Sequence, residues 1–296
     1  MTDNFWVVGL VDYNSSADTD RCVTSLLSID MASAKLQILV VDNSGSYASD
    51  NPSVKVLSPG KNLGYAGAVN ILMHAARLLD VDYLWILNND CEVRADCLVR
   101  YMDAISVNSH DLYTSVSTYG DRRTVWYAGG FVDRRSGRTA HVGYGSDRSY
   151  HSSGATQATS WASGANIVVP KSTLIHASDW RQDFFLYLEE LEWQMSSRYS
   201  VGLVQHDLVV HHAGSSTVAV SSDLEFAFSA RNRLKIVRSL PDFSFVLWIG
   251  CWIVDFILKP LSKRQWRRVL IGAISPLTVF VSGEKLVQVC RTLSAD

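Results

Sequence analysis

The chain has 296 residues, of which 47% are hydrophobic and 19% are charged, and its formal net charge is -2. This length suits one large α/β domain or a domain with an appendage, and the composition excludes a disordered chain. The near-neutral charge gives no reason to expect a nucleic-acid partner. Five scattered cysteines without a Cys-x-x-Cys pair argue against a zinc ribbon or a disulfide framework and favour a reducing compartment.

The first hundred residues alternate between strand-like and helix-like segments. Short apolar runs predict strands at 5–11, 36–41, 54–57 and 83–87. A first helix lies between the first two runs, with Asp18 or Thr19 as its N-cap, and a second helix covers 65–79. This order predicts an α/β fold with a mostly parallel central sheet and right-handed crossovers.

The pattern loosens between residues 101 and 160, where glycine, serine, tyrosine and arginine are common. We expect a mobile loop within 134–158. Regular structure returns with a helix after the sequence FFLYLEE and a strand at 202–210, which ends in His211 and His212.

The last sixty residues differ from the rest. The run FSFVLWIGCWIVDFIL at 243–258 is shorter than the roughly 20 apolar residues that a membrane-spanning helix needs, and basic residues outnumber acidic ones after it. These features favour helices lying on an anionic membrane surface. A buried helix or a dimer interface is the alternative.

Polar residues gather where three of the predicted strands end. The three groups are Asp12, Tyr13 and Asn14; Asp42, Asn43 and Ser44; and Asn88, Asn89 and Asp90. Singly, each group suits a turn or a helix cap. Ligands of open α/β sheets bind at the carboxyl ends of strands, so three groups on one edge predict a site for Mg²⁺ or Mn²⁺ together with a diphosphate.

A glycine-rich segment, GKNLGYAGAVN, lies between the third and fourth strands. Gly60, Gly64 and Gly67 allow a ligand to approach the backbone closely, and Asn62 and Asn70 offer amide contacts. The segment matches neither the dinucleotide fingerprint nor the Walker loop.

The chain resembles the family 2 glycosyltransferases of GT-A fold, and most closely their rhamnosyltransferase-like branch, which builds bacterial surface polysaccharides such as O-antigen. The resemblance rests on the order and spacing of VDYNSS, VVDNSGS, NLGYAGAVN, LWILNNDCEV, WYAGG, WASGANIVV, FFLYLEELEW, VVHHAGSS and ARNRLKIV. It covers about residues 5 to 238 and implies inverting sugar transfer from a nucleotide-diphosphate sugar with a divalent cation.

The resemblance also implies roles for the strand-end residues. Asp90 takes the place of the main metal ligand, and Asn88 stands where an acid often stands. Asp42 corresponds to the aspartate that contacts the nucleotide base or ribose, although DNSGS lacks the later acid often seen there. In the family, a histidine at this place approaches the metal or the diphosphate, and His211 is a better match to it than His212. The remaining donor candidates are Asp12, Tyr13, Asn14, Asn43, Asn62, Gly64, Gly67, Asn70 and Asn89.

An inverting transferase needs one base for the acceptor hydroxyl, and the resemblance places it at Glu190, with Glu189 as the alternative. Glu190 is one methylene longer than the usual aspartate. Without the resemblance, these acids would be read as ordinary first-turn residues that complement the helix dipole.

Two further groups come from the resemblance. The residues that would shape the sugar and acceptor pockets are Trp126, Gly129, Gly130, Trp161, Ser163, Gly164 and Ala165. Arg231 is a candidate for a bidentate phosphate contact, with a surface helix arginine as the alternative. Tryptophan rings stack on sugars, but core packing is the default role of the chain's nine tryptophans.

These expectations combine into one hypothesis. Residues 1–100 form the nucleotide-sugar half, 101–238 the acceptor half and 239–296 a membrane-associated helical extension. The donor is dTDP- or UDP-linked, with L-rhamnose as first candidate, and the acceptor is a glycan on a polyprenyl diphosphate. No signal sequence is evident, so we expect a cytoplasmic protein, peripheral on the inner face of the bacterial cytoplasmic membrane. An oligomer, a nucleotidyltransferase and a silent sugar-binding scaffold stay open.

Overall fold

The computed structural model describes residues 4–31, 34–150, 156–212, 218–236, 239–240, 242–278 and 283–292. Its strands are β1 (Phe5–Asp12), β2 (Lys35–Asp42), β3 (Val54–Leu57), β4 (Tyr83–Leu87), β5 (Cys91–Val93), β6 (Leu112–Tyr119), β7 (Val125–Tyr127), β8 (Gly130–Asp133), β9 (Arg138–His141), β10 (Thr156–Thr159), β11 (Asn166–Pro170) and β12 (Val201–His211). Its α-helices are α1 (Ser16–Leu27), α2 (Gly64–Leu78), α3 (Cys97–Val107), α4 (Lys171–Leu174), α5 (Glu189–Ser197), α6 (Val218–Ile236), α7 (Phe245–Ile253), α8 (Lys259–Ser262), α9 (Trp266–Ile274) and α10 (Gly283–Thr292). A π-helical stretch η4 (Val254–Leu258) joins α7 to α8, and shorter 3₁₀ turns are η1 (Arg148–Tyr150), η2 (Gln182–Phe184) and η5 (Ser275–Thr278).

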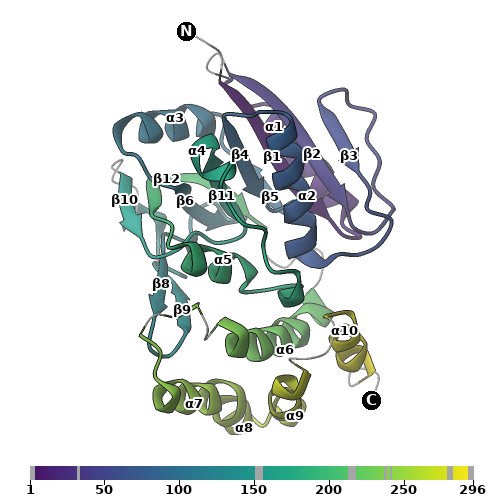
Figure 1. Ribbon diagram of the computed structural model, residues 1–296, viewed down its shortest axis with the longest axis vertical. Helices are drawn as coiled ribbons and strands as arrows, with labels where there is room; N and C mark the ends of the chain where they lie inside the picture. The colour runs from purple at the N-terminus through teal and green to yellow at the C-terminus, as the bar shows by residue number, and fades with distance from the viewer. Residues whose placement is uncertain are drawn as a thin grey trace.

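The central sheet has the strand order β10-β12-β6-β11-β4-β1-β2-β3 (Figure 1). Strand β1 pairs in parallel with β2 and β4, β2 with β3, and β6 with β12. Strand β11 runs antiparallel to both β4 and β6, and β10 antiparallel to β12. The prediction of an α/β fold with a mostly parallel sheet is therefore confirmed.

Helices cover both faces of this sheet, and the alternation of side chains in β1 shows why. Trp6 and Val8 point to the core beneath α1 and α3, whereas Val7 and Val11 point to the core beneath α2 and α5. A strand buried on both faces reads as a continuous apolar run, which is the pattern of β1, β2 and β4.

Two local predictions need correction. Helix α1 begins at Ser16, earlier than the predicted caps Asp18 and Thr19, and Thr19 is fully buried. The segment predicted as a mobile loop at 134–158 contains the second strand of the β8–β9 hairpin, whose turn places Gly137 at φ +67°. Residues 151–155 of that segment lie outside the described residues.

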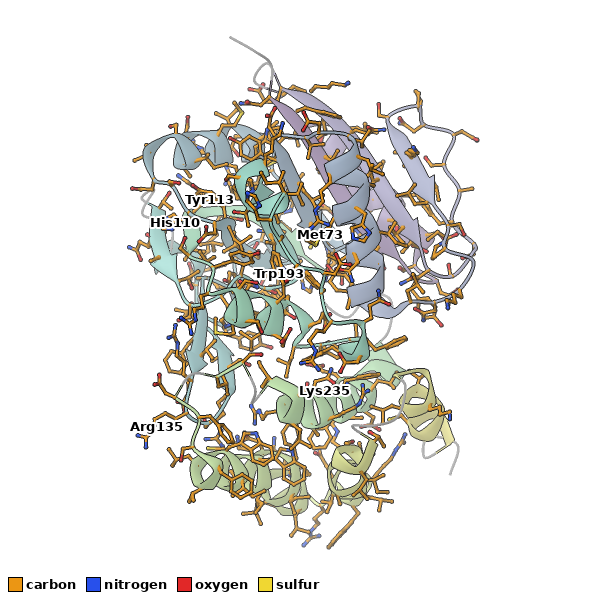
Figure 2. The ribbon with its side chains drawn as sticks, viewed as in Figure 1. Met73, His110, Tyr113, Arg135, Trp193 and Lys235 are labelled. Carbon is orange, nitrogen blue, oxygen red and sulfur yellow. The ribbon has the colours of Figure 1, made fainter. Side chains whose placement is uncertain are left out.

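The C-terminal helices pack together on the side of the molecule away from β1 to β3 (Figure 1). Trp248, Trp252 and Phe256 bury one side of the α7–α8 stretch against Ala230 of α6. Helix α6 in turn lies next to the α/β part, and Figure 2 shows its Lys235 below Trp193 of α5. Phe245–Ser262 is the one helical stretch among the described residues that is long and apolar enough to cross a membrane, and 22% of it is buried.

Candidate active site

The polar groups predicted at the strand ends meet at one edge of the sheet. Asp12 and Asp42 are register partners at the ends of β1 and β2. The Thr19 hydroxyl donates to Asp12 Oδ1 over 2.6 Å, and Asn89 Nδ2 donates to the same hydroxyl over 2.8 Å. Parallel strands end on a common edge, and these hydrogen bonds join the ends of β1 and β4 through the Thr19 hydroxyl of α1.

Asp90 and His211 come together at this edge. Strand β12 pairs with β5 so that His211 lies opposite Cys91, and His212 N–H donates to the carbonyl of Asp90 over 2.9 Å. His211 Nε2 therefore lies 3.3 Å from Asp90 Oδ1, and the two side chains are 8% and 17% exposed. His212 turns instead to Glu92, with 2.9 Å between Nε2 and Oε1.

The atoms of this pair suit a divalent cation. No described residue forms a hydrogen bond of good geometry with Asp90 Oδ1 or with either ring nitrogen of His211, although all three atoms are buried. Buried polar atoms of this kind call for a partner. Burial raises the pKa of Asp90, but the interactions with His211 outweigh it and lower the pKa, so the carboxylate is charged. A carboxylate and an imidazole fit Mn²⁺ or Mg²⁺.

Cys91, to which sequence analysis gave no role, is the third member of this cluster. One ligand atom from each of Asp90, Cys91 and His211 lies within 4.8 Å of the others. Cys91 is fully buried in the apolar core, and burial raises the pKa of its thiol well above the usual value. A neutral thiol is a poor ligand, so Asp90 and His211 are the stronger pair.

Glu189 and Glu190 open α5, but they occupy different surroundings. Glu189 is 3% exposed, and none of the described residues bonds its Oε2. Burial and the like charge of Glu190 raise the pKa of Glu189 well above its ordinary value. Glu190 is half-buried against Gly164, and burial raises its pKa to about 7. Such a pair divides into one protonated acid and one base near neutral pH.

Tyr65 of α2 bonds the segment that lies against Glu190. Its hydroxyl donates to the carbonyl of Gly164 over 2.8 Å. Burial raises the pKa of Tyr65, and the charges of Glu189, Glu190 and Asp90 raise it further. The charges of the α5 carboxylates and of Asp90 thus all act on the hydroxyl of this half-buried tyrosine.

Comparison with known proteins identifies the family of the chain. Residues 8–157, half of the chain, match the family described as Glycosyl transferase family 2. The chain belongs to this family. No curated protein matches the chain.

Solved structures of glycosyltransferases share the fold of the chain at low sequence identity. The crystal structure of GalNAc-T7 with UDP, GalNAc and Mn²⁺ has a TM-score of 0.59 and 14% identity, covering 80% of this chain and 48% of that chain. The mannosyltransferase PcManGT from Pyrobaculum calidifontis, in complex with GDP-Man and Mn²⁺, has a TM-score of 0.53 and 12% identity, covering 98% and 80%. S. aureus TarS 1-349 has a TM-score of 0.50 and 13% identity, covering 99% and 87%. The chain thus spans about half the length of GalNAc-T7.

Three asparagines that are predicted to contact the nucleotide-sugar donor form hydrogen bonds with the protein's own backbone. Asn70 is buried and bonds both the N–H and the carbonyl of Trp180, over 2.7 and 2.8 Å. Asn43 bonds the carbonyl of Gly64 and the N–H of Leu63. Asn62 accepts from Gly64 N–H over 2.8 Å, at the start of α2. Asn43 and Asn70 have both ends of the side-chain amide bonded, which leaves little for a ligand. Asn62 has its Oδ1 bonded at the start of α2, and its contact to the sugar donor stays a prediction.

The glycines of this segment have structural reasons of their own. Gly64 has φ +71°, and a Cβ there would lie 2.4 Å from the carbonyl oxygen of Phe185. A Cβ on Gly67 would lie 2.6 Å from that of Leu63. Both glycines therefore serve the packing of α2, and a donor contact at either stays a prediction.

Asp42 shapes the turn that follows β2. Its Oδ1 accepts from Ser44 and Gly45, and its Oδ2 accepts from Tyr47 N–H. Burial raises the pKa of Asp42, but the hydrogen bonds from Ser44, Tyr47 and Gly45 outweigh it and lower the pKa. Its predicted contact to base or ribose stays a prediction, as do the contacts of the exposed Tyr13 and Asn14 and of Asn88.

The two predicted sugar-pocket tryptophans differ. Trp126 of β7 is half-buried and stacks on His211, with ring centroids 4.1 Å apart. Trp161 is 4% exposed and packs over Gly130, where a Cβ would lie 2.3 Å from Nε1. Of these two rings, only that of Trp126 therefore contacts a candidate metal ligand, His211, and remains partly exposed. Gly129 has φ +112°, which favours glycine at that position.

The segment 163–165 lies between the two halves of the site. Asn88 N–H donates to the carbonyl of Ala165 over 3.0 Å, and Gly164 contacts Glu190. Ser163 Oγ accepts from Ala165 N–H at 3.4 Å. The three residues connect the end of β4 to the first turn of α5.

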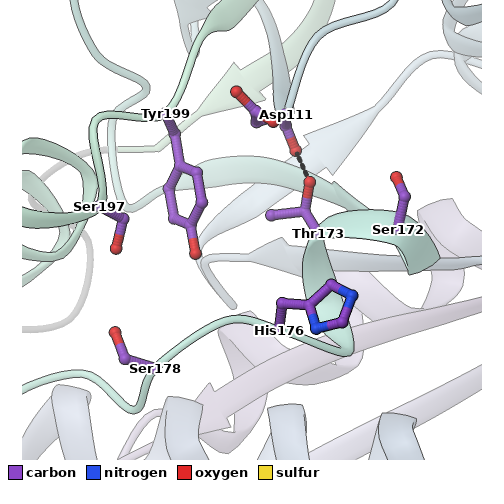
Figure 3. Close-up of a pocket in the computed structure, with 7 residues that line it drawn as sticks. All are labelled: Asp111, Ser172, Thr173, His176, Ser178, Ser197 and Tyr199. Atoms are coloured by element: carbon purple, nitrogen blue, oxygen red, sulfur yellow. Dashed lines mark hydrogen bonds between the residues drawn. The ribbon is translucent and has the colours of Figure 1, made fainter.

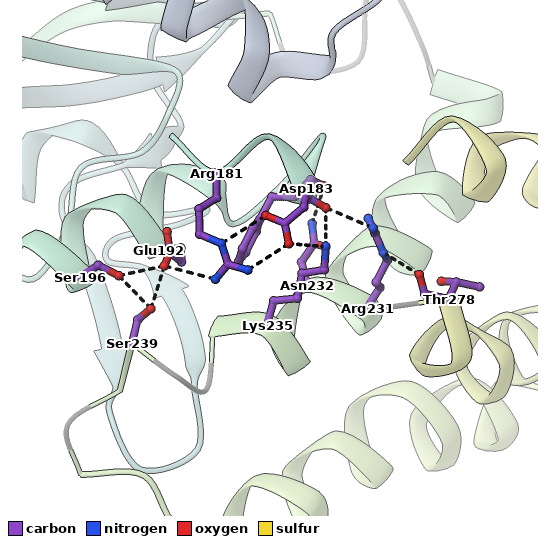
Figure 4. Close-up of polar contacts among 10 residues, drawn as sticks. Arg181, Asp183, Glu192, Ser196, Arg231, Asn232, Lys235, Ser239 and Thr278 are labelled. Carbon is purple, nitrogen blue, oxygen red and sulfur yellow. Dashed lines mark hydrogen bonds and ion pairs between the residues drawn. The ribbon is translucent and has the colours of Figure 1, made fainter. Parts of the chain in front are cut away.

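Arg231 lies elsewhere. It is 1% exposed, and its Nε and Nη2 donate to the carbonyls of Thr278 and Asp183 (Figure 4). Both acceptors are backbone oxygens, so the structure gives this arginine a structural contact and places it neither on the surface nor beside Asp90.

Sequence reasoning missed Gln194, whose amide bonds both the N–H and the carbonyl of Ala162 and ties α5 to the segment that contains Gly164. It also missed a hollow of about 450 Å³ (Figure 3). The hollow is lined by Asp111, Ser172, Thr173, His176, Ser178, Ser197 and Tyr199. These residues lie near the starts of β6 and β12, whereas His211 ends β12, so the hollow is at the opposite edge of the sheet.

Proposed function

We propose that this glycosyltransferase is metal-dependent and inverting, and that it transfers a sugar from a nucleotide-diphosphate donor to a hydroxyl of a lipid-linked glycan. The observation that carries the proposal is the convergence of Asp90, His211 and Glu190. The first two form a buried carboxylate–imidazole pair whose facing atoms have no hydrogen bond of good geometry with a described residue. Glu190 lies against Gly164, whose neighbour Ala165 accepts from Asn88 N–H at the end of β4.

Glu190 is the proposed base. It is more accessible than Glu189, and its pKa of about 7 allows it to be deprotonated in a working enzyme and to accept a proton during the reaction. As the acceptor oxygen attacks the anomeric carbon, its proton passes to Glu190 and the bond to the diphosphate breaks on the opposite face. A cation held by Asp90 and His211 would offset the charge on the departing diphosphate.

The donor candidates come from the family resemblance. We take dTDP-L-rhamnose as the first candidate and UDP-hexoses as the second. GalNAc-T7 is described with UDP and GalNAc, and PcManGT with GDP-Man, both with Mn²⁺, which supports a nucleotide sugar and Mn²⁺ as starting conditions. A role in O-antigen or related surface polysaccharide synthesis is part of the same proposal.

A donor panel tests this function. The protein, Mn²⁺ and dTDP-, UDP- or GDP-linked sugars should release nucleoside diphosphate from one donor in preference to the others. Release of pyrophosphate would support the nucleotidyltransferase instead. No release from any donor, with nucleotide sugar still bound, would support the silent scaffold. Asn88 in place of a usual acid and Glu190 in place of the usual aspartate are the features that favour that alternative.

We also propose that the C-terminal helices rest on an anionic bilayer, which would bring the enzyme to a lipid-linked acceptor on the cytoplasmic face. Val246 is 77% and Leu258 49% exposed on the α7–α8 stretch. Its acid, Asp255, bonds Arg138, Arg233 and Lys259, which outweigh burial and lower its pKa. The inner side of the stretch is thus tied to β9 and α6, and the outer side is apolar.

A basic rim completes the surface. Lys263 and Arg264 are exposed, and neither forms an ion pair with a described residue. An apolar face with a basic rim fits the boundary between lipid headgroups and acyl chains better than a spanning position, because Asp255 and its partners stay packed against the protein.

Vesicle flotation tests the membrane proposal. The full chain should float with phosphatidylglycerol vesicles, less so at high salt and little with neutral phosphatidylcholine vesicles. Joint Lys263→Glu and Arg264→Glu changes should weaken binding about tenfold or more, since each basic residue contributes about 1 kcal/mol near such a surface. Val246→Glu should also weaken it, whereas Leu78→Glu, at an 88% exposed site on α2, should not. Equal flotation of all variants would contradict the proposal.

A further inference from the structure

The two carboxylates of the site follow a segment with an unusual backbone. Phe185, Tyr187 and Leu188 have φ values of +66°, +65° and +68°, and Glu189 comes next in the chain. Residues other than glycine rarely adopt these positive φ values, and such a backbone conformation persists only where the surrounding structure holds it. The direction in which α5 leaves Leu188, and so the position of Glu190, therefore depends on whatever holds residues 184–188.

Asn232 of α6 supplies that hold from one side. Its Nδ2 donates to the carbonyls of Phe184, Leu186 and Tyr187, over 3.0, 2.8 and 2.8 Å. The side chain is fully buried, and no described residue bonds its Oδ1. A buried oxygen without a hydrogen bond costs stability, so packing alone would favour an apolar residue at this position. We therefore attribute the role of Asn232 to its Nδ2 group, which donates the three hydrogen bonds.

Arg231 and Lys235, on the same helix as Asn232, bind Asp183 at the start of the same segment (Figure 4). Lys235 Nζ pairs with Asp183 Oδ2 over 2.9 Å and also donates to the Asp183 carbonyl. Arg231 donates to that carbonyl as well, over 3.1 Å. Three residues of α6, Arg231, Asn232 and Lys235, thus bind backbone oxygens of residues 183–187.

Helix α2 closes the other side of the segment. Tyr65 N–H donates to the carbonyl of Phe185 over 2.7 Å, and Gly64 leaves the space that this carbonyl occupies. The Phe185 ring stacks on Phe228 of α6, with centroids 5.8 Å apart. The segment is therefore held between α2 and α6, with Glu189 and Glu190 at its end.

We propose that Asn232 is a positioning residue for sugar transfer, which fixes Glu190 at the acceptor side by binding three carbonyls of the preceding segment. This inference rests on the proposed function of Glu190. Asn232 touches no reacting atom in this account and acts through the backbone of residues 184–188.

The test compares Asn232→Ala with Asn70→Ala in the full chain with Mn²⁺ and donor. Both asparagines are buried and bond backbone carbonyls, but Asn70 bonds Trp180 and not the segment before Glu190. Asn232→Ala should lower kcat about 100-fold, the cost of a misplaced reacting group, while the donor KM changes less than about threefold. Asn70→Ala should lower the melting temperature without this kcat loss. Asn232→Ser keeps one donor and should lose about tenfold.

A pH profile separates positioning from general loss of structure. Burial raises the pKa of Glu190 to about 7, and Glu189 and Tyr65 are the titratable groups that interact with it. If the segment is no longer held, water reaches Glu190 and the pKa of Glu190 falls. The acidic limb of the kcat profile should therefore move below pH 7 in Asn232→Ala and stay in place in Asn70→Ala. An unchanged kcat and limb in both Asn232 variants would overturn the inference.

Hydrogen exchange covers the case in which the assay shows no turnover. Amides of residues 183–190 should exchange faster in Asn232→Ala or Asn232→Ser than in the wild type and in Asn70→Ala. If the wild type transfers no sugar, the proposed function fails, and exchange still decides whether Asn232 holds the segment. Unchanged exchange would contradict that hold.

Discussion

Replacement of Glu190 by glutamine is expected to lower the rate of sugar transfer about a thousandfold while leaving donor binding nearly intact. Glutamine keeps the size of the side chain but cannot accept the proton of the acceptor hydroxyl, and positioned bases contribute about 10²–10⁴ in rate. Glu190 lies against Gly164, and glutamine there leaves the strand-end side chains predicted to bind the donor unchanged. Transfer assays combined with calorimetric titration of the donor measure both effects.

Glu192→Gln is the matched control on the same helix. Glu192 accepts from Ser196 and Ser239 and lies 3.5 Å from Arg181, a different set of neighbours (Figure 4). Its variant should transfer at a rate within about threefold of the wild type. Full turnover by Glu190→Gln would remove Glu190 from the mechanism, and loss of turnover in Glu189→Gln alone would move the base to Glu189.

Glu190→Gln should also increase the free energy of unfolding at pH 8. The folded-state pKa of Glu190 is raised to about 7, so between its unfolded value and pH 7 the folded state holds more protons than the unfolded state, and stability falls as pH rises. Above pH 7 the buried charge costs no more than about 3 kcal/mol, which glutamine removes. Activity of the wild type should rise with pH through the same range, because the base must be deprotonated.

Asp90→Asn is expected to abolish Mn²⁺ binding and to lower transfer by at least about a thousandfold. Asparagine keeps the shape of the side chain but removes the only charged ligand of the Asp90–His211 pair. His211→Ala should weaken Mn²⁺ binding by a smaller factor, because the carboxylate remains. Electron paramagnetic resonance of Mn²⁺ measures binding without turnover.

His212→Ala controls for the loss of an imidazole next in the chain. His212 pairs with Glu92 and not with Asp90 through its side chain, so its variant should bind Mn²⁺ as the wild type does. Chelation by EDTA should stop transfer by the wild type, and added Mn²⁺ should restore it. Metal-independent transfer, or normal Mn²⁺ binding by Asp90→Asn, would refute the proposed metal site.

Much of the site could be predicted from local sequence patterns. Asp12, Asp42 and Asp90 each end an apolar run, and strands linked by crossover helices run parallel, so their ends had to share an edge. The roles of Glu190 and His211 came from resemblance to a family, because an acid in a first helical turn and a histidine at a strand end are common without any function.

The amino-acid sequence by itself determined the α/β class, the sheet edge that carries the polar groups and the apolar, basic character of the C-terminal region, because all of these follow from periodicity and composition. Only the tertiary structure decided what each amide or ring contacts. Asn70 and Asn232 bond backbone groups distant in sequence, over 110 and about 45 residues, and Trp126 borders His211 while Trp161 is buried. A side chain's partner across such separations depends on how helices pack against the sheet, which no local pattern records.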